Sequence, residues 1–103
     1  MDVKVFKMLT GEEVIGELTK FEGEMLFIKH PLGLAINHEE GRLVFVPYMP
    51  YTSAPEEIVV PVTSLLIEPL VPIESIAEDY KNTIQKIFQK VFIPERSIIR
   101  PVK

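Results

Sequence analysis

The stretch that decides the fold is Leu9-Thr10-Gly11-Glu12-Glu13-Val14-Ile15-Gly16-Glu17-Leu18-Thr19-Lys20-Phe21-Glu22. Its Thr10-Gly11-Glu12 portion has the composition of a tight turn, because glycine adopts positive φ without strain. The apolar residues that follow predict a strand. Gly16 inside this strand permits a sharp bend, which a small barrel needs where its strands turn a corner.

Short strands are also expected on both sides of this stretch. Turn residues separate the apolar groups at the spacing of an all-β barrel or sandwich. We expect Pro31 and Pro47 to end strands and residues 47–55 to form a long loop. The expected strands are Val3–Met8, Val14–Leu18, Met25–His30, Arg42–Val46, Ile58–Val60 and Leu65–Ile67. Leu34–Asn37 is expected to continue the strand Met25–His30 after a bulge at Gly33.

The pattern changes to helical spacing from Ile73 onward and predicts one helix, about Ser75 to Phe92. Ser75 and Glu78 have the spacing of a capping box, and Pro94 is expected to end the helix. Its apolar stripe is about 160° wide, broader than the ~100° that docking on one surface needs. We therefore expect one domain: a β-barrel over residues 1–72, and over 73–103 a helix and extended tail packed on the barrel or on a neighbouring subunit.

Length and composition restrict the class of protein. The chain has 103 residues, 47% of them hydrophobic, which suits a single domain with its own core. The absence of cysteine excludes disulfides, zinc–thiolate sites and thiol nucleophiles. No apolar run approaches the ~18 residues of a membrane span, and the first residues lack the apolar block of a secretory signal. We expect a soluble, cytoplasmic protein without membrane contact.

The charge is distributed unevenly along the chain. Residues 1–72 contain eleven acidic and five basic residues, whereas residues 73–103 contain four acidic and six basic ones. Proteins that bind nucleic acids through phosphate neutralisation are usually basic. The predicted barrel therefore has a net negative charge, which is opposite to the charge of a general nucleic-acid binder.

Two stretches resemble the sequence motifs of the Sm and Sm-like (Lsm) proteins. Residues 5–28 look like the first motif, in which a turn glycine precedes a bent strand with its own glycine and then an aromatic residue followed by an acid. Met25 falls where the family has a methionine. Residues 58–67 look like the family's final pair of short strands, and the chain is also similar to the compact Sm-like proteins of bacteriophages. The resemblance implies a strongly bent, five-stranded open barrel and a cyclic homo-oligomer of five to seven subunits.

The chain departs from the family at the three places that form its uridine pocket. The resemblance places a base-stacking side chain, a uracil-reading asparagine and an arginine–glycine pair where this chain has Glu24, Leu26 and Pro61-Val62. An acid repels phosphates, and leucine has no amide with which to bind a base edge. We therefore expect the usual RNA pocket to be absent.

The residues give no indication of catalysis or of a bound cofactor. His38-Glu39-Glu40 is a local trio of potential metal ligands, but three adjacent residues rarely converge on one ion, so a polar turn is expected. The pairs Glu12-Glu13, Glu39-Glu40 and Glu56-Glu57 point neighbouring side chains apart. No nucleophile elbow or phosphate-binding glycine loop is present. The prediction is a non-enzyme without cofactor or metal.

Two roles remain open at this point. One is a scaffold or adaptor that acts through protein surfaces of a ring. The other is an RNA-binding protein that uses a surface other than the usual pocket. Tyr48 and Tyr51 would be stacking residues for such a surface. The basic candidates lie in the C-terminal third: Lys81, Lys86, Lys90, Arg96, Arg100 and Lys103.

Overall fold

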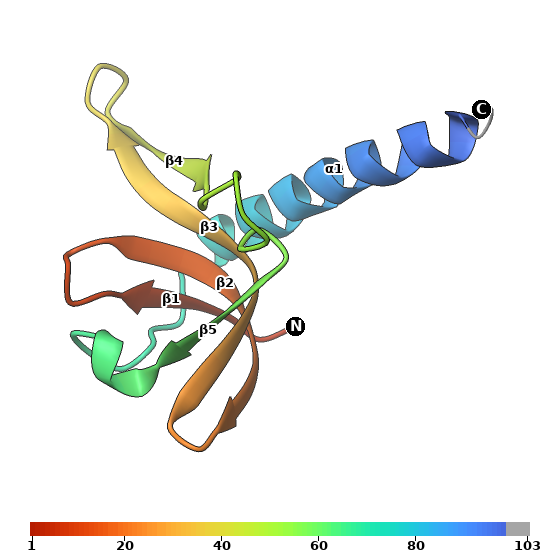
Figure 1. Ribbon diagram of the computed structural model, residues 1–103. Coiled ribbons are helices and arrows are strands. Elements are labelled where there is room, and N and C mark those ends of the chain that lie inside the picture. Colours follow the sequence, from red (N-terminus) through yellow and green to blue (C-terminus); the bar gives the residue numbers. More distant parts are fainter. Residues whose placement is uncertain (99–103) are drawn as a thin grey trace. The chain divides into compact units, whose positions relative to one another are not determined.

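The computed structural model describes residues 1–98 of the chain, with side chains described up to Phe88. The chain divides into two compact units, Met1–Pro72 and the part that begins at Ile73. All the strands belong to the first unit and the long helix to the second (Figure 1). Each unit is described separately below.

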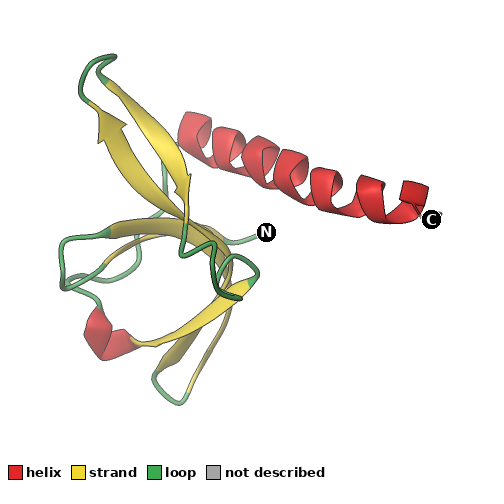
Figure 2. Ribbon diagram, turned by 45° about the horizontal axis from the view of Figure 1, so that its top comes forward, coloured by secondary structure: helices red, strands yellow, loops and turns green. Residues whose placement is uncertain are grey.

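Five antiparallel strands form one sheet in the first unit (Figure 2). The expected fold class is confirmed: the protein is mainly β with one C-terminal helix, and its strands are not closed into a complete barrel. This arrangement is compatible with a small Sm-like fold. The strands are β1 (Val3–Lys7), β2 (Glu13–Glu22), β3 (Met25–Asn37), β4 (Arg42–Pro47) and β5 (Glu57–Pro61).

The long strand β3 organises the sheet because it has different partners along its length. The strand order is β1-β2-β3-β4, and β5 pairs with β3 beside β4. The first part of β3, Met25–Lys29, pairs with β5, and the later part, from Leu32 to Asn37, pairs with β4. The register of β2 against β3 shifts near Gly16 and again near Thr19, which is where extra residues bend the pair.

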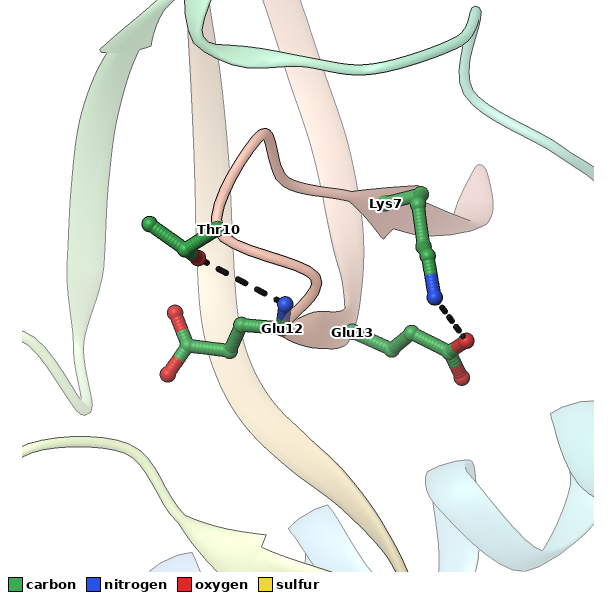
Figure 3. A network of polar contacts seen from close by, with 4 residues as sticks. All are labelled: Lys7, Thr10, Glu12 and Glu13. Carbon is green, nitrogen blue, oxygen red and sulfur yellow. Dashed lines mark hydrogen bonds and ion pairs between the residues drawn. The ribbon is translucent and has the colours of Figure 1, made fainter.

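The turn between β1 and β2 forms as expected from its glycine. Gly11 has a φ of 93°, and the Met8 N–H donates to the Glu12 carbonyl at 2.8 Å. Figure 3 shows that the carboxylates of Glu12 and Glu13 point to opposite sides of this turn. Glu13 accepts a 2.9 Å hydrogen bond from Lys7 Nζ, and the Glu12 N–H donates to Thr10 Oγ1.

A segment after β5 covers the outer edge of β1. It begins with a 3₁₀ helix, Val62–Ser64, and its backbone then follows β1. The Leu66 N–H donates to the Lys7 carbonyl at 2.8 Å, and Val5 and Leu70 exchange two backbone hydrogen bonds of 2.7 and 2.9 Å. The expected strand Leu65–Ile67 is therefore wrong, since the segment forms only isolated bridges. Proline at position 69 has no N–H with which to continue a ladder.

The core of the first unit lies between the two ends of the bent sheet. Phe6, Leu26, Ile28 and Leu65 form a buried cluster, which partly buried residues of β2, β5 and the 3₁₀ helix surround. These side chains come from segments far apart in the sequence. Burial of a large apolar side chain contributes about 1.5–3 kcal/mol, so this cluster is a major source of stability.

The expectation that Pro31 stops a strand is wrong, whereas the expected continuation of that strand into Leu34–Asn37 is confirmed. The bulge expected at Gly33 is absent, because Gly33 pairs regularly with Val14 and Val46. Strand β3 continues through Pro31, which is fully buried, and its irregularity lies at His30, where φ is 52°. The left-handed backbone at His30 redirects the chain before the proline. Because Pro31 lies where β3 changes partner, its missing N–H interrupts neither ladder.

The second unit contains the helix α1 (Glu74–Ile98). The helix begins one residue before the predicted start, and the N–H groups of Ile76 and Ala77 both donate to the Ile73 carbonyl. Ser75 therefore lies inside the helix and not at its N-cap. The predicted end at Phe92 and the extended tail from Ile93 are wrong as far as Ile98, because the helix continues past Pro94. A proline inside a helix removes one hydrogen bond without necessarily ending it. Residues 99–103 of the predicted tail lie outside the described residues.

Candidate functional site

The three positions of the family pocket come together at one end of the sheet. Glu24 lies in the turn between β2 and β3, Leu26 follows on β3, and Pro61 ends β5. Met25 is paired with Pro61, and the Val62 N–H donates to the Glu24 carbonyl at 2.8 Å. The structure therefore assembles these positions into one place, although they are far apart in the sequence.

The side chains at these positions offer no groups for base recognition. Leu26 is only 3% exposed and packs in the core cluster with Phe6 and Ile28. Glu24 is exposed and carries a negative charge, and Pro61 has no N–H. None of these three side chains supplies a hydrogen-bond donor for uracil or a positive charge for phosphate.

Two aromatic residues, Phe21 and Phe27, lie beside these positions, and the ring of Phe27 contacts the side chain of Lys20. Lys20 Nζ lies 4.9 Å from the centre of the Phe27 ring and 3.1 Å from a Glu22 carboxylate oxygen. Phe21, on the same strand, is exposed. The Lys20 charge is therefore shared between an aromatic face and an acid.

The long loop expected between Pro47 and Pro55 is present and is held by its own hydrogen bonds. Thr52 Oγ1 donates to the Met49 carbonyl at 2.8 Å and accepts from the Ala54 N–H at 3.0 Å. Ala54 is buried, so the loop is anchored to the sheet unit at that point. Met49 has a φ of 43°, a left-handed conformation that is uncommon outside glycine.

The two tyrosines of this loop have different surroundings. Tyr48 donates from its hydroxyl to Glu12 at 3.4 Å. Burial raises the pKa of Tyr48, and the nearby Glu12 carboxylate acts in the same direction. Tyr51 is 83% exposed. Of the two stacking candidates, Tyr51 is the more exposed, and Tyr48 is partly buried.

The basic candidates of the C-terminal third lie partly beyond the described side chains. Lys81 and Lys86 are exposed on α1, and Lys81 Nζ is 3.9 Å from Glu78. Lys90 and Arg96 belong to the part of α1 whose side chains are not described, and Arg100 and Lys103 lie outside the described residues. The role of these bases as a nucleic-acid surface therefore stays a prediction.

The polar trio at residues 38–40 forms the turn between β3 and β4. Asn37 Oδ1 accepts hydrogen bonds from the N–H groups of Glu39 and Glu40, at 3.0 and 3.3 Å. Glu40 also forms a 2.8 Å ion pair with Arg42. Among the described residues, no three His, Cys, Asp or Glu side chains are close enough to hold a metal ion.

The strand β4 forms one free end of the sheet. Within residues 1–98, no strand pairs with β4 on the side away from β3. Leu43 and Val46 on this strand are exposed, at 37% and 43%. An edge with unpaired backbone groups and apolar side chains is a template for another strand.

The segment 64–71, along β1, forms the other end. Its inner side is bonded to β1, and no described strand pairs with its outer side. Four large apolar side chains of this segment are exposed: Leu66, Ile67, Leu70 and Val71. Glu68 is the only charged residue between Ser64 and Val71. The sheet therefore has two different apolar ends, which sequence reasoning did not locate.

Comparison with known proteins gives no family assignment. No protein-family model matches the sequence, and no curated protein matches it significantly. Within the described residues, no helix has both the length and the apolar character needed to cross a membrane.

Proposed function

We propose that the protein is a non-enzymatic, Sm-like assembly protein that forms a closed homo-oligomeric ring and acts as a scaffold or adaptor. The observation that carries this proposal is the presence of two different apolar edges at the two ends of one sheet. One is β4 with Leu43 and Val46, and the other is the segment 64–71.

Two different edges favour a ring over a twofold dimer. When one edge of a subunit pairs with the other edge of the next, the contact is head-to-tail. Repeated head-to-tail contacts form a ring where the rotation between subunits closes and an open filament where it does not, and we propose the closed form. The resemblance to Sm-like proteins implies five to seven subunits. Edges that stay unpaired in a monomer are usually protected by charged residues or strand-breaking features. Here each edge carries one charged residue and one proline: Arg42, which is paired with Glu40, and Pro47 on β4, and Glu68 and Pro69 in the segment 64–71. The apolar side chains outnumber these protective residues in the segment 64–71.

The free energy gained by burying these edges is similar in size to the cost of bringing two subunits together. Six exposed apolar side chains line the two edges, each about half exposed. Burying the exposed half of each would contribute about 5–9 kcal/mol in total. Backbone hydrogen bonds across the pair add about 0.5–1.5 kcal/mol each. The loss of translational and rotational freedom opposes these terms by about 4–15 kcal/mol.

The alternative function is RNA binding through a surface other than the family pocket. The exposed ring of Tyr51 supports it, because an exposed aromatic side chain can stack on a base. The charge near the loop opposes it, since Glu56 and Glu57 follow the loop and no basic residue lies between Arg42 and Lys81. RNA that co-purifies with the protein and cross-links to Tyr51 would favour this alternative.

Edge variants test the proposed ring. We expect Val46→Lys and Leu66→Lys each to give monomers, because each places a charge in the contact. Both positions are exposed in the single chain, so neither change disturbs the core. An equimolar mixture of the two variants retains one intact pair of edges and should form a 1:1 dimer. The matched control is Phe21→Lys, at an exposed position away from both edges, which should leave the oligomer unchanged.

The outcome of the mixture is the decisive one. A dimer in the mixture, with monomers in each variant alone, supports head-to-tail pairing. Full oligomers in either single variant, or monomers in the mixture, contradict the assignment of the two edges. Light scattering after gel filtration separates these outcomes.

A further inference from the structure

The junction at His30 connects two parts of β3 that belong to different pairs of strands. Lys29 is the last residue paired with β5, and Leu32 is the first paired with β4. His30 between them has a φ of 52°. The part after the junction, residues 32–37 with residues 42–47 of β4, is called the arm here. The arm projects away from the rest of the sheet in both views (Figures 1 and 2).

Few contacts hold the backbone at this junction, and they are close. The His30 N–H donates to the Glu56 carbonyl at 2.9 Å, which ties β3 to the end of the long loop. Gly16 of β2 lies against the other side. A Cβ added there would lie 3.4 Å from Pro31 Cα and 3.3 Å from the Lys29 carbonyl oxygen. A left-handed residue other than glycine costs about 1–2 kcal/mol, so the surrounding contacts must hold it in place.

The His30 imidazole is half-buried among charged groups from three segments. Glu17 of β2 and Glu56 of the loop act to keep a proton on it, and Lys29 of β3 acts against a proton. Burial acts in the same direction as Lys29 and is the largest effect, so the pKa of His30 is lowered from 6.5. The neutral ring is therefore the form that fits the junction.

We propose that the His30 junction is a proton-responsive hinge, at which protonation of the imidazole loosens the connection between the arm and the rest of the sheet. Burial opposes a charge on the imidazole, so a protonated His30 favours arrangements in which the ring is more exposed. Movement of the ring toward solvent strains the left-handed backbone and the bond from His30 to Glu56. The hinge operates within a single chain and does not depend on ring formation.

The direction of the pH effect follows from linkage. A histidine whose pKa is lowered in the folded state binds fewer protons there than in the unfolded state. Its contribution to stability is fully present above pH 6.5 and is lost as the pH falls through the folded-state pKa. The arm should therefore be held at neutral pH and released as the pH falls through the folded-state pKa of His30, which lies below 6.5.

Hydrogen exchange of the full chain at pH 7 and pH 5.5, corrected for the intrinsic exchange rates, tests the hinge. We expect the protection of arm amides to fall by a larger factor than that of amides between β1 and β2. His30→Asn should remove this difference, because asparagine accepts the left-handed backbone and does not titrate. His38→Asn is the matched control, since the chain has only these two histidines, and it should retain the difference.

Several results would overturn the hinge. One is an equal loss of amide protection in the arm and in the β1–β2 pair at pH 5.5. A second is a gain in protection of the arm at low pH. A third is a larger loss of protection in the arm that persists in His30→Asn. If His30→Asn fails to fold, NMR titration of the unmodified chain decides the matter. The arm amides should then shift with the same midpoint as the His30 ring, and separate midpoints would contradict the proposal.

Discussion

Replacing Gly16 by alanine should destabilise the protein strongly because β3 passes directly over this glycine. An added Cβ would lie 2.5 Å from Ile28 Cγ2, closer than real side chains approach. Ile28 is fully buried in the core cluster, so its methyl group cannot move into solvent. The main chain of Lys29 and Pro31, at 3.3 and 3.4 Å, also limits any movement.

The expected loss follows from this overpacking. Forcing an extra carbon into a packed core costs about 1–3 kcal/mol. In a domain of this size, each 1 kcal/mol shifts the melting temperature by about 4–8 °C. Gly16→Ala should therefore lower the Tm by at least about 4 °C, and by 20 °C or more at the upper end.

Gly33 provides the matched control on the same pair of strands. The nearest atom to a Cβ at Gly33 is the Val46 carbonyl oxygen at 3.5 Å, an ordinary contact, and its φ does not require glycine. Gly33→Ala should change the Tm by only a few degrees, because alanine there also reduces the entropy of the unfolded chain. Thermal melting of both variants by circular dichroism is the assay. If Gly16→Ala melted with the unmodified protein, the close packing at the bend would be refuted.

Three further predictions concern single sites. Leu26→Asn should destabilise the fold by about 3 kcal/mol without creating uridine binding, because the amide would be buried in the core; sub-micromolar binding of oligo-uridine in fluorescence anisotropy would contradict this. Lys7→Ala should cost less than about 1 kcal/mol in urea unfolding, because the ion pair with Glu13 is partly exposed, and a larger loss would reveal a structural role. Tyr48 should ionise above the ordinary pKa of about 10, so Tyr48→Phe should reduce the ultraviolet tyrosinate signal above that pH by the share of one tyrosine. Because its folded-state pKa is raised, its contribution to stability is present below pH 10 and is lost as the pH rises further.

Local patterns in the sequence predicted the elements whose signals are local. The turn at Gly11 and the two strands that flank it follow from composition and alternation. The helix follows from its apolar spacing, but it continues past Pro94, where the proline predicts its end. Proline inside a helix removes one hydrogen bond and its ring crowds the carbonyl four residues earlier, so it bends or ends a helix according to its surroundings.

Features that depend on long-range pairing could not be predicted in this way. The passage of β3 through Pro31 becomes possible only because its partners change at that residue. The composition of residues 65–67 is typical of a strand, but the segment forms only isolated bridges to β1 and to Met8. The left-handed backbone at His30 has no sequence signal apart from the proline that follows it.

The candidate site was predicted in part. Glu24, Leu26 and Pro61 were grouped by resemblance, and the structure does bring these positions together. The resemblance carried no information on burial, and Leu26 proves to be a core residue. The two apolar edges were not located, because exposure depends on which segments cover each strand.

The mass of the native protein in solution tests the central proposal most directly. Native mass spectrometry of the full chain at micromolar concentration compares that mass with the 11.8 kDa of one subunit. A closed ring predicts one dominant species of five to seven subunits, about 59–83 kDa, without a ladder of larger forms. A monomer, or an open series of oligomers that grows with concentration, would contradict the proposed ring.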